Sequence, residues 1–231
     1  MTLFKLTHIL SGDWLRRNSD FLVFPGYMAL MAGLLYAFGI WDFSWLVITG
    51  VFIGIFASCF NKREKLMGPF LNLVGSAIFM VYFLSIGLYG MFLSQVFFAS
   101  LALATLFSWH RRNPVTHKTL KPSFAPKSII ILLVLIFVTA GIVGYVMRGT
   151  IGLLDYAVMA GGITGQFLLM RKKIQVWPVW ITCDILSVPM YVMTGSWLLV
   201  ARCPAFMTIN TTAFFRWRKL IKNDITPKTA D

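Results

Sequence analysis

Residues 151–195 read IGLLDYAVMAGGITGQFLLMRKKIQVWPVWITCDILSVPMYVMTG, two apolar stretches separated by the basic triplet Arg171-Lys172-Lys173. Each stretch has about the 20 apolar residues that a helix needs to cross a hydrocarbon core roughly 30 Å thick. The segment therefore predicts two neighbouring membrane-spanning helices. The basic residues between them predict that their connection lies on the cytoplasmic side of the membrane.

The same pattern extends over the whole chain. Eight apolar stretches have the length of a membrane span: 21–39, 44–60, 67–87, 88–108, 128–147, 151–170, 176–195 and 196–215. Hydrophobic residues make up 58% of the 231 residues, so there is no room for a soluble catalytic domain. The sequence predicts a single all-α polytopic membrane domain over residues 1–231, with eight transmembrane helices.

Positive charge is concentrated on one side of this eight-helix arrangement. Of the 21 Lys and Arg residues, all but Arg148 and Arg202 lie in the amino-terminal segment, in alternate connections and in the carboxyl-terminal tail. Because Lys and Arg are enriched on the cytoplasmic side, we expect both termini to lie inside the cell. A basic inner rim facing anionic lipid also explains the net charge of +13. No nucleic-acid partner is therefore expected.

The chain contains an internal repeat. Similar residues recur at shifts of 108 to 111 positions: Gly50 and Gly161, Lys62 and Arg171, Pro69 and Pro178, Tyr82 and Tyr191, Gly87 and Gly195, Trp109 and Trp217. The matches pair residues 44–108 with residues 151–215, leaving 128–147 as a linker helix and 21–39 as an extra N-terminal helix. One inserted helix makes two three-helix repeats parallel, which predicts a 3+1+3 core. Such halves enclose a site near the bilayer midplane.

The polar residues inside the spans are candidate site residues. Asp184 lies about 12 Å inside its predicted helix, at 1.5 Å per residue, which is close to the middle of the membrane. A carboxylate there is costly unless it is paired, protonated or facing water. Trp177 and Trp180 share the helix face of Asp184. Two indoles and a carboxylate suit a flat aromatic cation.

Structural interpretations of these three residues remain open. Asp184 is alternatively a protonated residue hydrogen-bonded between helices. Trp177 is alternatively part of an aromatic belt at the inner membrane surface. Further polar residues of the two repeats are candidates for hydrogen bonds to a bound amide or hydroxyl group: Asn72, Tyr82, Gln95, Gln166, Tyr191 and Asn210. Each of them is alternatively a link between helices.

Two further expectations concern structure rather than binding. Asp155 and Arg202 both lie about one turn inside the outer ends of their predicted helices, so we expect a structural or gating ion pair between them. Three cysteines lie in apolar segments without C-x-x-C spacing: Cys59, Cys183 and Cys203. They are expected to be small core residues, not a disulfide or a metal site.

Enzymatic function is not expected from the motifs in the chain. It contains no G-x-x-x-x-G-K-[ST] phosphate loop, no H-E-x-x-H and no G-x-S-x-G sequence. We therefore expect neither catalysis nor a cofactor, and no ATP-driven pumping by this chain alone. A membrane enzyme or a scaffold subunit is the alternative class of function. A proton-coupled carrier that uses Asp184 as its relay is a further alternative.

Two sets of residues carry a resemblance to a known family. In the second repeat these are Gly165-Gln166, the basic triplet, Trp177-Pro-Val-Trp180, the acidic residue 184, Tyr191, Gly195 and Trp217. In the first repeat they are Gly68, Asn72, Tyr82, Leu88-Tyr89-Gly90 and Trp109. Together they make the chain, from about residue 44 to residue 219, resemble the PnuC family of bacterial vitamin transporters.

The resemblance implies a facilitator for nicotinamide riboside in the bacterial inner membrane, supplying NAD biosynthesis. It also implies a core like that of SWEET sugar carriers, a homotrimer, and trapping of the substrate by a cytoplasmic kinase. The pyridinium ring of nicotinamide riboside suits the two tryptophans and Asp184, and its carboxamide and hydroxyl groups suit Gln166, Asn72 and Tyr191. Relatives carry thiamine, riboflavin or deoxynucleosides, so these remain alternative cargoes; thiamine is also a flat aromatic cation.

Overall fold

The computed structural model describes residues 19–40, 44–110 and 121–225. Seven helices in these ranges are long and apolar enough to cross a membrane, which confirms the predicted all-α, multi-pass membrane protein. In chain order they are α3 (Asp20–Ala37), α4 (Trp45–Lys62), α5 (Met67–Ser85), α6 (Tyr89–His110), α7 (Lys127–Met170), α8 (Val176–Met193) and α9 (Trp197–Ile225).

Glycine ends two of these helices at equivalent places in the predicted repeats. Gly87 follows α5 with φ +71°, and Gly195 follows α8 with φ +67°. In this left-handed conformation, which glycine adopts without steric cost, the chain turns back on the helix. The amide of the next residue then reaches the helix, from Leu88 to the Phe83 carbonyl at 3.0 Å and from Ser196 to the Tyr191 carbonyl at 2.8 Å.

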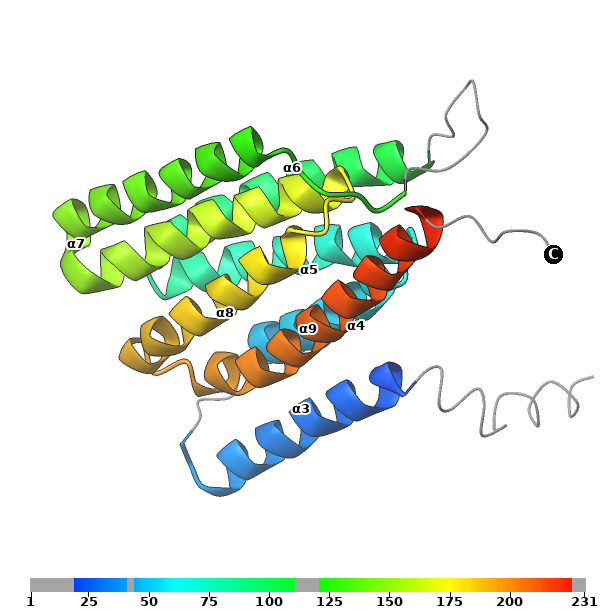
Figure 1. Cartoon of the computed structure of the whole chain (residues 1–231). Helices are drawn as coiled ribbons and strands as arrows, with labels where there is room; N and C mark the ends of the chain where they lie inside the picture. The colour runs from blue at the N-terminus through cyan, green and yellow to red at the C-terminus, as the bar shows by residue number, and fades with distance from the viewer. Residues whose placement is uncertain (1–18, 41–43, 111–120, 226–231) are drawn as a thin grey trace, which may run out of the picture.

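Helix α7 is two antiparallel arms rather than one rod. Its 44 residues include non-helical backbone at Arg148 (φ −140°, ψ 16°) and Gly149 (φ 64°, ψ −147°). The two arms, residues 127–147 and 150–170, lie side by side in Figure 1. A side chain on Gly144 or Gly152 would collide with the backbone of the other, so these glycines permit the close approach of the arms.

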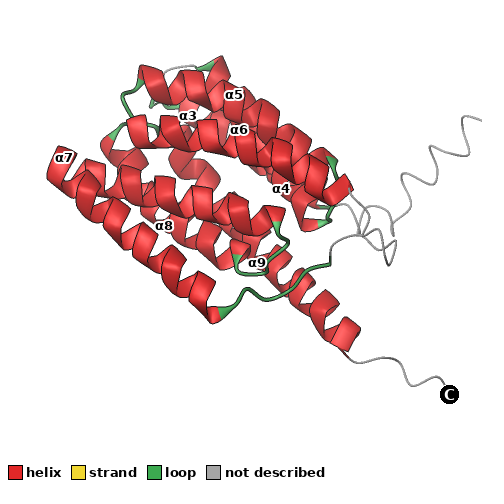
Figure 2. Ribbon diagram, turned by 90° about the horizontal axis from the view of Figure 1, so that it is seen from above, coloured by secondary structure: helices red, strands yellow, loops and turns green. Residues whose placement is uncertain are grey.

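Six helical segments form a closed ring. Along the ring α4 contacts α5, α5 contacts α6, α6 contacts α7, α7 contacts α8, α8 contacts α9, and α9 returns to α4. The second arm of α7 belongs to the ring, since Gly162 packs on Phe98 of α6. Figure 2 shows α4, α5 and α6 on one side of the molecule and α7, α8 and α9 on the other. Helix α3 lies outside the ring, against α4 and α9.

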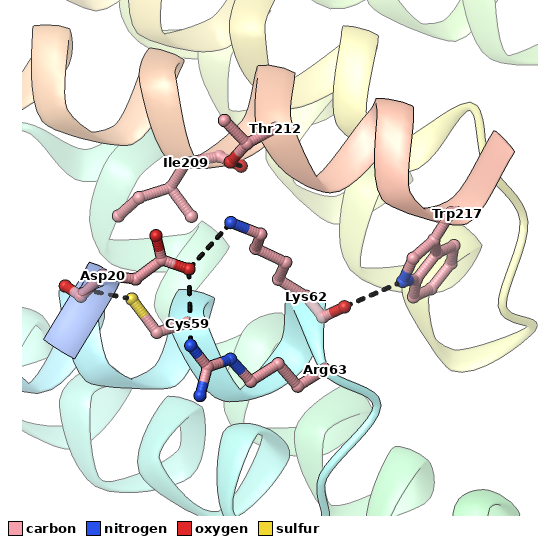
Figure 3. Close-up of polar contacts among 7 residues, drawn as sticks. All are labelled: Asp20, Cys59, Lys62, Arg63, Ile209, Thr212 and Trp217. Atoms are coloured by element: carbon pink, nitrogen blue, oxygen red, sulfur yellow. Dashed lines mark hydrogen bonds and ion pairs between the residues drawn. The ribbon is translucent and has the colours of Figure 1, made fainter. Parts of the chain in front are cut away.

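The first turn of α3 is attached to the end of α4 by charge. The Asp20 carboxylate lies 2.7 Å from Lys62 Nζ and 3.6 Å from Arg63 Nη2 (Figure 3). The indole N–H of Trp217 on α9 donates to the Lys62 carbonyl oxygen at 3.2 Å. Lys62 therefore links α3 through its side chain and α9 through its backbone.

The prediction of an ion pair between Asp155 and Arg202 is wrong, because the two side chains have different partners. Asp155, on the second arm of α7, accepts hydrogen bonds from the backbone amides of Gly90 at 2.9 Å and Met91 at 2.8 Å. These amides belong to the first turn of α6, where backbone N–H groups lack helical partners and the helix dipole favours a negative charge. Asp155 therefore anchors the start of α6 to α7, and Arg202 has other partners.

The three cysteines are buried and free, as predicted from their apolar surroundings. Cys59 lies on α4, where its thiol is 3.9 Å from the Asp20 carbonyl oxygen. Cys183 lies on α8 and Cys203 on α9. No disulfide joins them.

Candidate functional site

A cavity of about 150 Å³ lies inside the ring of helices. Each of the six ring segments contributes to its wall, for example Ser58 on α4 and Gln95 on α6. Six of the nine residues proposed from the sequence line this cavity: Asn72, Gln95, Gln166, Trp180, Asp184 and Asn210. The fold therefore brings together side chains from both predicted repeats.

Asp184 and Asn210 form the central polar contact of the cavity. The Asn210 amide nitrogen donates to Asp184 Oδ2 at 3.2 Å, which joins α8 to α9. Asp184 is 8% exposed and Asn210 is 1% exposed. Over the ranges that the structure describes, Asp184 forms no ion pair within 4.0 Å. The charge of Arg202 on α9 acts on this carboxylate from more than 4.0 Å away. A buried carboxylate whose one direct partner is an amide favours a further positively charged group beside it.

Trp180 supplies the aromatic wall next to this carboxylate. It is four residues before Asp184 on α8, so the two side chains share a face. Gly165 on α7 packs directly under the indole, where an added Cβ would collide with Nε1 and lie 2.5 Å from Cδ1. Because glycine has no side chain, the Trp180 ring can lie directly against the α7 backbone at position 165.

Trp177 lies behind Trp180 rather than in the cavity wall. Its ring is edge-on to Trp180, with centroids 5.6 Å apart at 81°, and edge-on to Trp217, with centroids 5.0 Å apart at 85°. Trp177 is fully buried in this cluster. It supports the position of Trp180 from behind.

Tyr191 and Tyr82 also lie outside the wall of this cavity. Tyr191 is fully buried, and its hydroxyl oxygen accepts a hydrogen bond from Arg202 at 3.1 Å. The Tyr82 hydroxyl lies 3.0 Å from Ser196 Oγ. Tyr82 and Ser196 line a second cavity of about 450 Å³ near the turn between α8 and α9, together with Thr194.

Arg202, which was expected from the sequence to pair with Asp155, lines the cavity instead. Its guanidinium carbon lies 5.2 Å from the ring centroid of Phe206 and 5.5 Å from those of Phe79 and Tyr191. These rings favour a cation by cation–π attraction. An arginine inside a membrane span is itself a sign of function, and that signal was present in the sequence.

Several polar atoms around the cavity have no hydrogen-bond partner. In the described part of the chain these include Gln166 Nε2, Asn210 Oδ1 and Arg202 Nε. A buried polar atom without a partner is costly, and a ligand with its own donors and acceptors removes that cost. Among the same residues, no group of three His, Cys, Asp or Glu side chains is placed to hold a metal ion. The arrangement is suited to binding a polar aromatic solute.

Comparison with known proteins gives consistent matches. The family model described as nicotinamide mononucleotide transporter matches residues 44–219. The nicotinamide riboside transporters PnuC of Escherichia coli (strain K12) and Shigella flexneri are each 23% identical over 188 residues, 68% of this chain and 78% of theirs. The crystal structure of the vitamin B3 transporter PnuC aligns with a TM-score of 0.69 at 16% identity, covering 92% of this chain and 99% of that one. At this identity the structural match shows a shared fold.

Proposed function

Since this chain belongs to the nicotinamide mononucleotide transporter family and is a membrane transporter rather than an enzyme, we propose that it carries nicotinamide riboside across the bacterial inner membrane. In this proposal it is a facilitator that supplies NAD biosynthesis. The cavity inside the helix ring is the binding site.

The observation that carries the proposal is the pairing of Trp180 with Asp184 in one cavity wall. Nicotinamide riboside has a positively charged pyridinium ring, which an indole face attracts and a carboxylate balances. Its carboxamide offers both donors and an acceptor to Gln166, Asn210 and Asn72. The unpartnered Gln166 and Asn210 atoms support this assignment.

The proposed architecture has eight crossings in a 3+1+3 arrangement. The bend at Arg148-Gly149 supports it, because the 44 residues of α7 would extend roughly 66 Å as one rod, about twice the hydrocarbon thickness. In this arrangement residues 44–108 and 151–215 are parallel repeats, 128–147 is the linker helix and α3 is the addition. The basic connections support a cytoplasmic location for both termini in this proposal.

Net uptake through a facilitator requires that the cargo be consumed inside the cell. We propose that a cytoplasmic kinase traps nicotinamide riboside by phosphorylation, and that the protein assembles as a homotrimer; both are carried over from the family resemblance. Proton coupling through Asp184 is the alternative. The facilitator is favoured because Asp155, the one other acid that the structure describes away from the first and last turns of the helices, has both oxygens engaged by α6 amides. Asp184 is therefore left without a relay partner.

Calorimetry of the purified protein tests the cargo. Nicotinamide riboside, thiamine, riboflavin and thymidine are titrated side by side, and we expect nicotinamide riboside to bind most tightly. If thiamine alone binds, thiamine is the cargo, and the cavity is still a site for an aromatic cation. Binding of none of the four would refute the site.

Transport by reconstituted vesicles tests the mechanism. We expect nicotinamide riboside uptake that does not respond to an imposed pH gradient, and we expect Asp184→Asn to preserve transport. Uptake that follows the gradient in the wild type and loses this dependence in Asp184→Asn would establish proton coupling.

A further inference from the structure

Arg202 is the one cation that the structure places in the wall of the central cavity, among the residues it describes. A cationic cargo does not need it, because the pyridinium ring is served by Trp180 and Asp184. The guanidinium is nevertheless held in place by contacts with Phe79, Tyr191 and Phe206. An arginine buried within a membrane span has a large desolvation cost, so such residues are rare and are usually functional.

The two charged side chains of the cavity come from different depths of the ring, although they lie within electrostatic reach of each other. On α9, Arg202 lies eight residues before Asn210, the partner of Asp184, which corresponds to about 12 Å along the helix axis. On the antiparallel α8, Trp180 precedes Asp184, and Tyr191, the partner of Arg202, follows it. The cavity therefore has an aromatic and acidic end near Trp180 and a basic end near Arg202.

The hydrogen-bond requirement of Arg202 is only partly met. A guanidinium carries five N–H donors and no acceptor. Its Nη2 donates to the Tyr191 hydroxyl oxygen, whereas the buried Nε has no acceptor in the described structure. A ligand that reaches this end must therefore bring oxygen acceptors, and a cationic group is repelled from it.

We propose that Arg202 forms the subsite for the sugar of the cargo and fixes the direction in which the cargo lies. Its N–H groups donate to hydroxyl or ring oxygens, and its charge keeps the pyridinium at the Trp180–Asp184 end. The ligand class is thus an aromatic cation joined to a neutral polyhydroxylated group. This inference rests on the proposed function and adds a specificity-determining residue to it.

The test compares two ligands on two proteins by calorimetry. Nicotinamide riboside carries the sugar, and 1-methylnicotinamide is the same ring cation without it. Arg202→Met keeps an unbranched, flexible side chain but removes the guanidinium with its donors and charge. We expect nicotinamide riboside to bind the variant roughly tenfold or more weakly, the effect of losing hydrogen bonds to a charged group. The affinity for 1-methylnicotinamide is expected to stay the same or rise.

Controls separate this role from a structural one. Arg148→Met removes an arginine outside the cavity, whose side chain bonds the Gly87 carbonyl at 2.7 Å, and should leave both affinities unchanged. If Arg202→Met does not fold, Arg202→Lys takes its place, because it keeps the cation and loses the planar set of donors. The same selective loss of nicotinamide riboside binding is expected.

The outcomes are distinct. Equal weakening of both ligands by Arg202→Met, or no weakening of nicotinamide riboside, would overturn the inference while leaving the proposed function intact. Absence of nicotinamide riboside binding to the wild type would instead refute the proposed function. Nicotinamide mononucleotide distinguishes the group recognised: if it binds the wild type more tightly than nicotinamide riboside and loses this advantage in Arg202→Met, the subsite is for an acidic group, and the assignment to a neutral sugar is wrong.

Discussion

Replacing Trp180 by leucine removes the aromatic face of the cavity and keeps an apolar side chain there. A cation–π contact contributes about 0.5–1 kcal/mol at an exposed site and about 2 kcal/mol when desolvated. Trp180 is half-buried and lines the cavity inside the helix ring, so we expect a loss between these limits, about 1–2 kcal/mol. At about 1.4 kcal/mol per factor of ten, the dissociation constant for nicotinamide riboside rises roughly 5- to 30-fold.

The assay is calorimetry with nicotinamide riboside and with its reduced, uncharged form, which keeps the sugar and the carboxamide. If the indole acts on the cation, Trp180→Leu weakens the charged ligand and changes the uncharged one much less. Trp45→Leu is the matched control, because Trp45 is an exposed tryptophan on α4 that lies outside the cavity wall. Equal weakening of the affinity for both ligands would mean that Trp180 contributes by packing and not by attraction to the cation. Unchanged affinity in a folded Trp180→Leu protein would remove Trp180 from the site.

Three further substitutions test the surrounding structure. Gly165→Ala places a Cβ against the Trp180 indole and should cost about 1–3 kcal/mol of stability by overpacking, measured by thermal unfolding, with weaker nicotinamide riboside binding by calorimetry. Asp155→Asn loses one of two acceptors for the α6 amides, so thermal unfolding should show a loss of about 1–3 kcal/mol without a change in ligand affinity. Asp20→Asn breaks the ion pair with Lys62 and should cost about 1 kcal/mol or less, with a difference that shrinks as salt is added; a larger loss in high salt would contradict the electrostatic account.

The sequence predicted the helices well because each span is set by local composition. The predicted span 176–195, for example, corresponds to α8 at Val176–Met193, and the difference is the turn at Gly195. The bend between 147 and 151 was also predicted, since two apolar stretches meet there at Arg148 and Gly149. The length of an apolar stretch, the charges that flank it and the glycines that end it depend on residues close together in the sequence. These features can therefore be recognised from the sequence itself.

The cavity was predicted less completely because it depends on which side of each helix faces its neighbours. Trp177 and Trp180 share a helix face, yet Trp177 is fully buried edge-on against Trp217 of α9, whereas Trp180 lines the cavity. Asp155 and Arg202 occupy similar depths in their helices, but Asp155 points to the start of α6 and Arg202 into the cavity. Depth follows from counting residues, whereas direction follows from packing between distant segments.

The central claim is that the cavity inside the helix ring binds the cargo between Trp180, Asp184 and Arg202. An experimental structure with nicotinamide riboside bound tests this directly. The account predicts the pyridinium ring within about 6 Å of the Trp180 ring centroid, with the ribose toward Arg202. Nicotinamide riboside bound instead in the second cavity, beside Tyr82 and Thr194, would contradict it.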